Sequence, residues 1–305
     1  MKSFISILVM IILVSFGRDA ASTVKETNLV PFDGIYGNWA IEMPSGASGW
    51  LTLKEVDGIP QGELWTVGGG KRLFELAIKD NSEFSFKRLI RVGEPEYPGG
   101  PPTGDRVKIH HEGVLKKDRL LIKYSLPNGK EYGYEGKRVG QLPTRPNLEL
   151  LKFGKPIVLF NGVDLKGWEP VNRSQKNGWE VVDGELRNTT PKTDFSPYST
   201  FGNLRTTSKF TDFNLKIDFN VPKGGNSGIY LRGVYEVQVV DRDSRMQGIQ
   251  GVGSVFGRIS PLDNSGKPGG EWNSYDITLV DRHVTVILND KKVIDNQPIE
   301  GCTNG

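Results

Sequence analysis

The amino-acid sequence predicts an all-β protein. The 305 residues include 38 glycines and 18 prolines, and no long segment repeats its apolar residues with a helical period of 3.6. Short runs with alternating apolar residues instead follow one another between turns. The clearest is Phe213–Val221, where apolar and polar side chains alternate over nine residues. We therefore expect antiparallel sheets, with an antiparallel β-sandwich in the C-terminal half.

The N-terminus has the layout of a secretory signal peptide. Lys2 precedes the apolar run Phe4–Phe16, and the small residues Ala20, Ala21 and Ser22 follow. The run is short for a membrane span, which favours a signal peptide over 1–22. We expect a chain exported to the periplasm or the extracellular space, without a membrane span once the signal is removed.

Composition excludes some classes of partner and site. The chain has 39 Lys and Arg against 36 Asp and Glu, interspersed along its length, so nucleic acid is not an expected partner. The single cysteine, Cys302, has no second cysteine with which to form a disulfide. Stability must then come from burial of apolar side chains.

Residues 30–139 are expected to form a small antiparallel β-barrel or sandwich. Strand-like runs include Gly49–Val56 and Arg106–His111, and Asn128-Gly129 marks a tight hairpin. His110 and His111 are adjacent, so on a strand they point to opposite faces and do not form a metal site. The Pro- and Gly-rich stretch Pro95–Pro102 is either a loop over a ligand or a simple connector.

A linker over 140–152, which contains two prolines, separates this domain from a second one over 153–305. In the second domain, Ile229–Asp241 resembles a strand with polar groups on one face. Glu236 and Gln238 share that face. Tyr230 and Arg232 share it too if the strand runs through Gly233 without a bulge, whereas Asp241 has the opposite parity. These side chains either grip sugar hydroxyls or form a solvated strand face.

Several segments, in order, carry a resemblance to a known family: FNGVDLKGW, WEVVDGEL, DFNLKIDF, GGNSGIYLRG, YEVQVVD, GSVFG, GEWNSYDITL and VILNDKKVIDN. Together they resemble the 3-keto-disaccharide hydrolase family over about residues 155–301. The resemblance implies a concanavalin- or laminin-G-like jelly-roll β-sandwich and an enzyme that acts on 3-keto-glycosides. Family domains continue past the turn corresponding to Gly301–Gly305 with strands that close the sandwich, so we expect the sequence to be a C-terminally incomplete fragment.

The chemistry expected for such a substrate is proton abstraction at C2, elimination at C1 and hydration. Under this hypothesis Glu236 is the base and Arg232 stabilises the enolate oxygen. Asp241 or Glu271 donates a proton to the leaving oxygen. The residues expected to bind the sugar are Asn226, Gln238 and Asn273 by hydrogen bonds, and Trp272 or Tyr230 by stacking.

Two alternatives remain open at this point. A non-catalytic glycan-binding module would use the same architecture and similar residues, because a fold does not determine a function. A calcium-bound sandwich would use Asp241, Asp243 and Asp263, although these residues lack ligand spacing. No cofactor is predicted, and the sequence leaves the help of a divalent metal open.

Overall fold

The computed structural model describes residues 5–15, 34–44, 47–66, 69–93, 104–173, 175–188 and 201–299. Within these ranges the chain forms strands, with two single-turn 3-10 helices, η1 (Leu148–Leu150) and η2 (Gly248–Gln250), and no α-helix. The all-β prediction is therefore confirmed. No helix in these ranges is long and apolar enough to cross a membrane. The loop Pro95–Pro102 and Cys302 lie outside the described residues.

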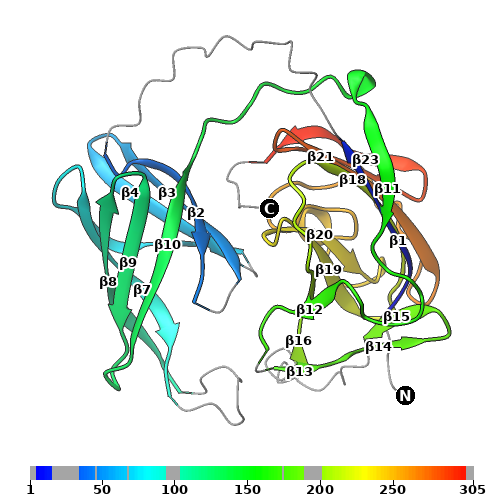
Figure 1. Cartoon of the computed structure of the whole chain (residues 1–305), viewed down its shortest axis with the longest axis horizontal. Coiled ribbons are helices and arrows are strands. Elements are labelled where there is room, and N and C mark those ends of the chain that lie inside the picture. The colour runs from blue at the N-terminus through cyan, green and yellow to red at the C-terminus, as the bar shows by residue number, and fades with distance from the viewer. Residues whose placement is uncertain are drawn as a thin grey trace. The chain divides into compact units, whose positions relative to one another are not determined.

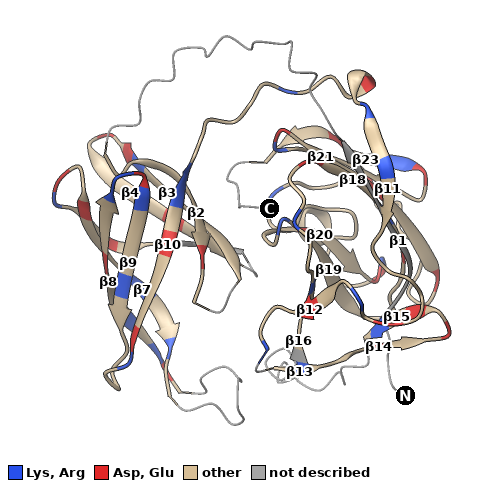
Figure 2. Ribbon diagram, viewed as in Figure 1, with Lys and Arg blue, Asp and Glu red and all other residues tan. Residues whose placement is uncertain are grey.

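The chain divides into two compact units. One contains residues 19–141, and the other contains residues 1–18 and 142–300. Each unit has its own sheets (Figure 1). In both, Lys and Arg are interspersed with Asp and Glu over the described ribbons (Figure 2), as the charges in the sequence predict.

The first unit is a nine-stranded antiparallel sheet. Its order is β5-β4-β3-β2-β10-β9-β8-β7-β6. The strands are β2 (Gly37–Glu42), β3 (Ser48–Val56), β4 (Ile59–Thr66), β5 (Gly69–Arg72), β6 (Phe74–Ile78), β7 (Glu83–Arg91), β8 (Arg106–Lys116), β9 (Arg119–Ser125) and β10 (Glu131–Val139).

One bent segment joins the two edges of this sheet. β5 pairs with β4, and β6 pairs with β7, while only Leu73 separates β5 from β6. The backbone N–H of Leu73 donates to the Gly62 carbonyl at 2.8 Å. A Cβ on Gly62 would lie 2.7 Å from Leu73 Cδ1, so a glycine permits this close approach. The sheet is thereby curled into a near-barrel, which leaves few edge groups unpaired.

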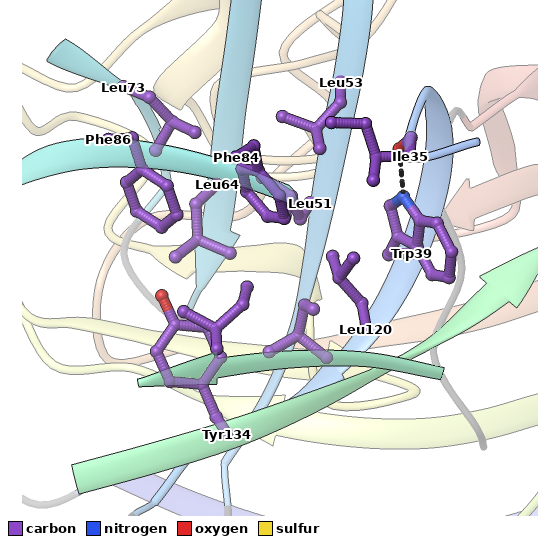
Figure 3. Packing of buried hydrophobic residues seen from close by; sticks show 12 residues of the cluster. Ile35, Trp39, Leu51, Leu53, Leu64, Leu73, Phe84, Phe86, Leu120 and Tyr134 are labelled. Carbon is purple, nitrogen blue, oxygen red and sulfur yellow. Dashed lines mark hydrogen bonds between the residues drawn. The ribbon is translucent and has the colours of Figure 1, made fainter. Parts of the chain in front are cut away.

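The interior of the near-barrel is a dense apolar core (Figure 3). Trp39 is fully buried, and its indole N–H donates to the Ile35 carbonyl at 2.9 Å. The guanidinium of Arg138 covers the Trp39 ring at 4.2 Å from the centroid. The other buried members are Ile41, Leu51, Leu53, Leu64, Leu73, Phe84, Phe86, Leu120, Ile122 and Tyr134. Alternation along each strand gives these residues a common inward face.

The second unit is built on one eight-stranded sheet with the order β14-β15-β1-β18-β21-β22-β23, in which β11 also pairs with β1. Its strands are β1 (Ile5–Ser15), β11 (Phe153–Val158), β14 (Trp179–Val182), β15 (Glu185–Asn188), β18 (Phe213–Asn220), β21 (Trp272–Val280), β22 (His283–Leu288) and β23 (Lys291–Pro298). Two short pairs accompany it, β12 (Trp168–Pro170) with β17 (Leu204–Thr206) and β13 (Lys176–Asn177) with β16 (Phe201–Gly202).

β1 occupies an interior position in this sheet. Its residues Ile5–Ile7 pair with β15, its residues Ile11–Ser15 pair with β11, and its other edge pairs with β18. The segment that sequence analysis assigns to a signal peptide therefore supplies a strand of the second unit. The signal-peptide assignment itself stays a prediction.

A separate hairpin, β19 (Asn226–Leu231) with β20 (Tyr235–Val240), packs on the large sheet. Contact runs through Tyr275 of β21, which is 2 % exposed and stacks on Phe219 with ring centroids 4.7 Å apart. Its hydroxyl donates to the Gln238 carbonyl at 2.6 Å and accepts from the Gly253 N–H at 2.7 Å. The hairpin is thus a second layer over the sheet.

Candidate active site

The polar segment Ile229–Asp241 is a hairpin rather than one continuous strand. Arg232 and Gly233 both have positive φ, 52° and 76°, and the Val234 N–H donates to the Leu231 carbonyl. Two consecutive positive φ values are typical of the tight turns that suit twisted hairpins. The condition under which Arg232 would share the face, a strand that runs through Gly233 without a bulge, is not met, because the three-residue loop 232–234 interrupts it. The sequence alone does not distinguish a glycine inside a strand from one in such a loop.

The hairpin nevertheless brings predicted residues together. Tyr230 lies directly opposite Glu236, and Gly228 lies opposite Gln238. Directly opposed residues project to the same face of an antiparallel pair. Tyr230 and Glu236 therefore share a face because they are cross-strand neighbours, not because they share parity along a single strand.

Glu236 and Tyr230 form the central pair of this face. The Tyr230 hydroxyl donates to Glu236 Oε2 at 2.8 Å, and both side chains are partly buried. Burial raises the pKa of Glu236 above its ordinary 4.5, and the hydrogen bond from Tyr230 opposes part of that rise. Burial, followed by the charge of Glu236, raises the pKa of Tyr230, so its phenol stays protonated at neutral pH and can donate. The result is a carboxylate that is more basic than an exposed one.

Gly228 leaves the space that the Glu236 side chain fills. A Cβ at Gly228 would lie only 2.2 Å from Glu236 Oε1 and 2.6 Å from its Cγ. No larger residue fits there unless the carboxylate moves. Gly228 is not among the residues that the sequence singles out for the site, and the signal that could have found it is a glycine placed opposite a polar strand position.

The backbone of Glu236 is held on both sides. β19 pairs with one edge of β20, and the residues after Gly253 run along the other. There the Phe256 N–H donates to the Glu236 carbonyl at 2.8 Å, and the Gln238 N–H donates to the Ser254 carbonyl at 3.0 Å. A rigid backbone fixes the carboxylate, which favours a defined chemical role.

Gln238 is placed differently from its prediction as a sugar ligand. It is 1 % exposed, and its Nε2 donates to the Gln250 carbonyl at 3.2 Å. Burial under η2 withdraws its amide from solvent. We therefore regard Gln238 as a support for the loop that covers it.

Asp241 holds two loops together. It is 3 % exposed and accepts from the backbone N–H groups of Gly224 at 2.6 Å, Asp243 at 3.2 Å and Gly269 at 3.0 Å. Burial acts to raise its pKa, but these three backbone donors outweigh burial and the pKa is lowered. A carboxylate that stays ionised and fully engaged is unsuited to donate a proton, so its role is structural.

Asn273 is likewise engaged with the backbone. Its Oδ1 accepts from the Lys267 N–H and from Asn289 Nδ2, each at 2.8 Å, and its Nδ2 donates to the Glu271 carbonyl. It is 3 % exposed. The amide shapes the loop before β21 and is not displayed to a ligand.

Glu271, Trp272 and Asn226 remain accessible. Glu271 is exposed, and its charge acts on Arg242, whose pKa is raised first by a hydrogen bond from its side chain to Asp243. Trp272 is half-buried at the start of β21, and Asn226 is exposed at the start of β19. The charge of Glu271 thus acts on Arg242. Among the described residues, no hydrogen bond or ion pair joins Glu271 to Glu236, whose partner is Tyr230.

Arg232 lies in the hairpin turn, half-buried and in the left-handed region of backbone space. Non-glycine residues adopt this region infrequently, and such positions cluster at functional sites. Arg232 follows Tyr230 by two residues, so it lies at the same end of the hairpin as the Glu236–Tyr230 pair.

The calcium alternative gains no support from these positions. In the described ranges, no three His, Cys, Asp or Glu residues gather as a metal-binding group. Asp241 is bound to backbone N–H groups, Asp243 pairs with Arg242 at 2.9 Å, and Asp263 accepts from the Ser265 hydroxyl.

The family of the chain follows from sequence comparison. The family model described as "3-keto-alpha-glucoside-1,2-lyase-like domain" matches residues 155–305, a range that includes β19, β20 and β21. The chain belongs to this family. The resemblance found from the short segments is therefore confirmed, and the Glu236–Tyr230 pair lies inside the 3-keto-alpha-glucoside-1,2-lyase-like domain.

Known members and structures are similar to this domain. A 3-keto-disaccharide hydrolase of Bacteroides thetaiotaomicron is 26% identical over 166 residues, which are 46% of this chain and 57% of that protein. The chain thus spans little more than half the length of this relative. Two crystal structures from Parabacteroides distasonis, each described as a "putative glycosyl hydrolase", are 34% and 26% identical. They cover 50% and 46% of this chain, and 70% and 72% of their own, with TM-scores of 0.39 and 0.38.

Proposed function

We propose that the second unit is a carbohydrate-active hydrolase that cleaves 3-keto-glycosides or 3-keto-disaccharides, with Glu236 as the base. The observation that carries the proposal is the partly buried Glu236 carboxylate, bonded to Tyr230 at 2.8 Å within the family domain. A carboxylate with a raised pKa is a suitable base for an acidified C–H bond.

The 3-keto group supplies that acidity. Glu236 takes the proton from C2, and the electrons form an enolate that Arg232 stabilises. The C1–O bond then breaks and its electrons leave with the aglycone oxygen. One water supplies the proton for that oxygen and the hydroxyl that adds at C1, and the proton on Glu236 returns to C2. The net change is hydrolysis, and it needs no second carboxylate beside the bond.

Tyr230 positions the base in this scheme. Its hydroxyl donates to Oε2 of Glu236, which orients the carboxylate while leaving Oε1 for the substrate. Trp272 and Asn226 are the accessible residues proposed for sugar contact. Asp241, Gln238 and Asn273 support the surrounding loops.

Activity of the full chain on 3-keto-trehalose or a chromogenic 3-keto-glucoside tests the proposal. Glu236→Gln keeps the size of the side chain and removes the base, so we expect kcat to fall by about 10²–10⁴-fold. Glu180→Gln, an exposed residue of β14, is the matched control and should cleave at the wild-type rate.

Two outcomes contradict the proposal. Equal rates for Glu236→Gln and wild type would show that Glu236 is not the base. If the wild type cleaves no keto-sugar but binds native glycans, the non-catalytic glycan-binding alternative is correct.

We also propose that the chain is exported, on the strength of Lys2 followed by the apolar run Phe4–Phe16. Removal of a signal peptide would also remove β1, because this strand, which pairs with β18, lies within the same apolar run. The intact mass of the protein recovered outside the cytoplasm decides between removal and retention of residues 1–22. Recovery of all the protein from the cytoplasm would overturn export.

A further inference from the structure

An aromatic ladder crosses four strands of the first unit, outside the residues that match the family model. Phe86 of β7 lies opposite His111 of β8, His111 opposite Tyr124 of β9, and Tyr124 opposite Tyr132 of β10. Successive rings stack, with centroids 4.8, 4.5 and 5.3 Å apart. Phe86 and His111 are fully buried, whereas Tyr124 and Tyr132 are half-exposed. The ladder thus leads from solvent into the core.

His111 presents a buried acceptor to this ladder. Its Nδ1 lies 2.9 Å from the Ile109 carbonyl, which can only accept, so Nδ1 carries the proton. Burial lowers the pKa of His111 to about 4, and the ring is neutral at physiological pH. Nε2 is then an acceptor, and it has no hydrogen-bond partner among the described residues. Buried polar atoms are rarely left in this state without a water or a ligand.

Tyr134 provides a second buried polar group. It is 3 % exposed, and Figure 3 shows its hydroxyl directed into the barrel toward Phe86. Its ring lies 6.2 Å from those of both His111 and Tyr124. Within the described ranges, its hydroxyl has no partner that meets strict hydrogen-bond geometry. Burial raises the pKa of Tyr134, and the side chain of Arg88 acts against this rise through both its charge and its hydrogen-bonding.

Arg88 adds a positive charge to the same wall. It is two residues from Phe86 on β7, so it shares the inward face, and it lies opposite the buried Ile109. Its charge acts on His111, Tyr124 and Tyr134. Arg88 takes part in none of the ion pairs among the described residues. Glu75, the carboxylate on the adjacent strand β6, pairs with Lys87 and Lys108 instead. Half-buried cations normally have a counter-charge.

We propose that Arg88, His111, Tyr124 and Tyr134 form a binding site for a small carboxylate that carries a hydroxyl, such as a hexuronic acid. Arg88 and the phenols bind the carboxylate, and a ligand hydroxyl donates to His111 Nε2. The site is independent of the function proposed for Glu236.

Calorimetric titration of the full chain with D-glucuronate tests the site, with D-glucose as the neutral ligand of the same ring. We expect saturable binding of glucuronate and at least tenfold weaker binding of glucose. Arg88→Gln should weaken glucuronate binding at least tenfold. Lys123→Gln removes the same charge from an exposed position next to Tyr124 and should bind like wild type.

Two further variants keep the test decisive if Arg88→Gln does not fold. Tyr124→Phe preserves the ring stack, and Arg88→Lys preserves the positive charge. Tyr124→Phe should weaken glucuronate binding severalfold, and Arg88→Lys should retain more affinity than Arg88→Gln. Absence of saturable glucuronate binding, equal binding of glucose, or wild-type affinity in both Arg88→Gln and Tyr124→Phe would overturn the proposal.

Discussion

The two β units enclose polar side chains by different means. In the near-barrel, the imidazole of His111 lies between the rings of Phe86 and Tyr124, with its own neighbouring carbonyl as its hydrogen-bond partner. In the second unit, the carboxylate of Asp241 is surrounded by backbone N–H groups from three loop residues. One environment keeps its titratable group neutral and the other keeps it ionised.

This difference separates structural from chemical roles. Where backbone donors satisfy a buried polar group, as at Asp241 and Asn273, the group shapes a loop. Glu236 has only a side-chain donor and a raised pKa, so it retains basicity for a substrate. The presence or absence of backbone donors therefore distinguishes the Asp241 carboxylate from the Glu236 carboxylate.

The largest expected effect is a loss of stability at acid pH that comes from His111 in the near-barrel, and it tests the contrast between the neutral His111 and the ionised Asp241. His111 has a pKa of about 4 against an ordinary value of 6.5, so the unfolded chain takes up a proton there before the folded one does. Stability from this group is fully present above pH 6.5 and is lost as the pH falls toward 4, by about 3 kcal/mol. Urea denaturation at a series of pH values measures it.

The control for that loss is His111→Phe, which keeps a ring in the stack and cannot titrate. It should lose less stability than wild type between pH 6.5 and 4. The groups whose charge reaches His111 are Arg88 and His110, and both are present in the His111→Phe variant. An identical acid dependence in the two proteins would show that His111 is not the source.

The next effect concerns the position of the proposed base. Gly228→Ala places a methyl group where Glu236 now lies, so we expect kcat on a 3-keto-glucoside to fall about 10²-fold while the fold persists. The matched control is Gly133→Ala in β10, where the nearest atom to a new Cβ is 3.4 Å away. A rate for Gly228→Ala equal to that of Gly133→Ala would mean that the position of Glu236 does not matter.

The smallest expected effect is on the free energy of unfolding, and it compares the buried Asp241 with a surface carboxylate. Asp241→Asn keeps the shape but removes the charge that three backbone donors bind, and we expect a loss of about 2 kcal/mol in unfolding free energy. Asp243→Asn, at an exposed position, should lose less than about 0.5 kcal/mol. Equal losses in thermal or urea unfolding would contradict the structural role of Asp241.

Much of the strand pattern could be read from the sequence. The run Phe213–Val221 corresponds to β18, and the turns at Asp183-Gly184 and Asp281-Arg282 join β14 to β15 and β21 to β22. The opposite orientations of His110 and His111 also agree with alternation, since His111 is fully buried and His110 is exposed. These features depend on local periodicity and turn residues.

The site was less accessible to such reasoning. The type of each residue suggested sugar contacts for Gln238 and Asn273 and proton donation for Asp241. Their roles depend instead on the loops that fold over them. Those loops come from distant positions, such as Gly269 for Asp241, and a strand pattern contains no such information. Glu236 and Tyr230 were grouped correctly because a hairpin and a continuous strand both give them a common face.

The interior position of β1 has a consequence for how the chain folds. Ile12 pairs with Leu215, and the whole near-barrel lies between them in sequence, so the barrel is topologically an insertion between two strands of one sheet. Contacts this distant in sequence form slowly, whereas the near-barrel pairs mostly neighbouring strands. We expect the near-barrel to fold first, and loss of Ile5–Ser15 to leave β15 and β18 with new open edges that attract another strand.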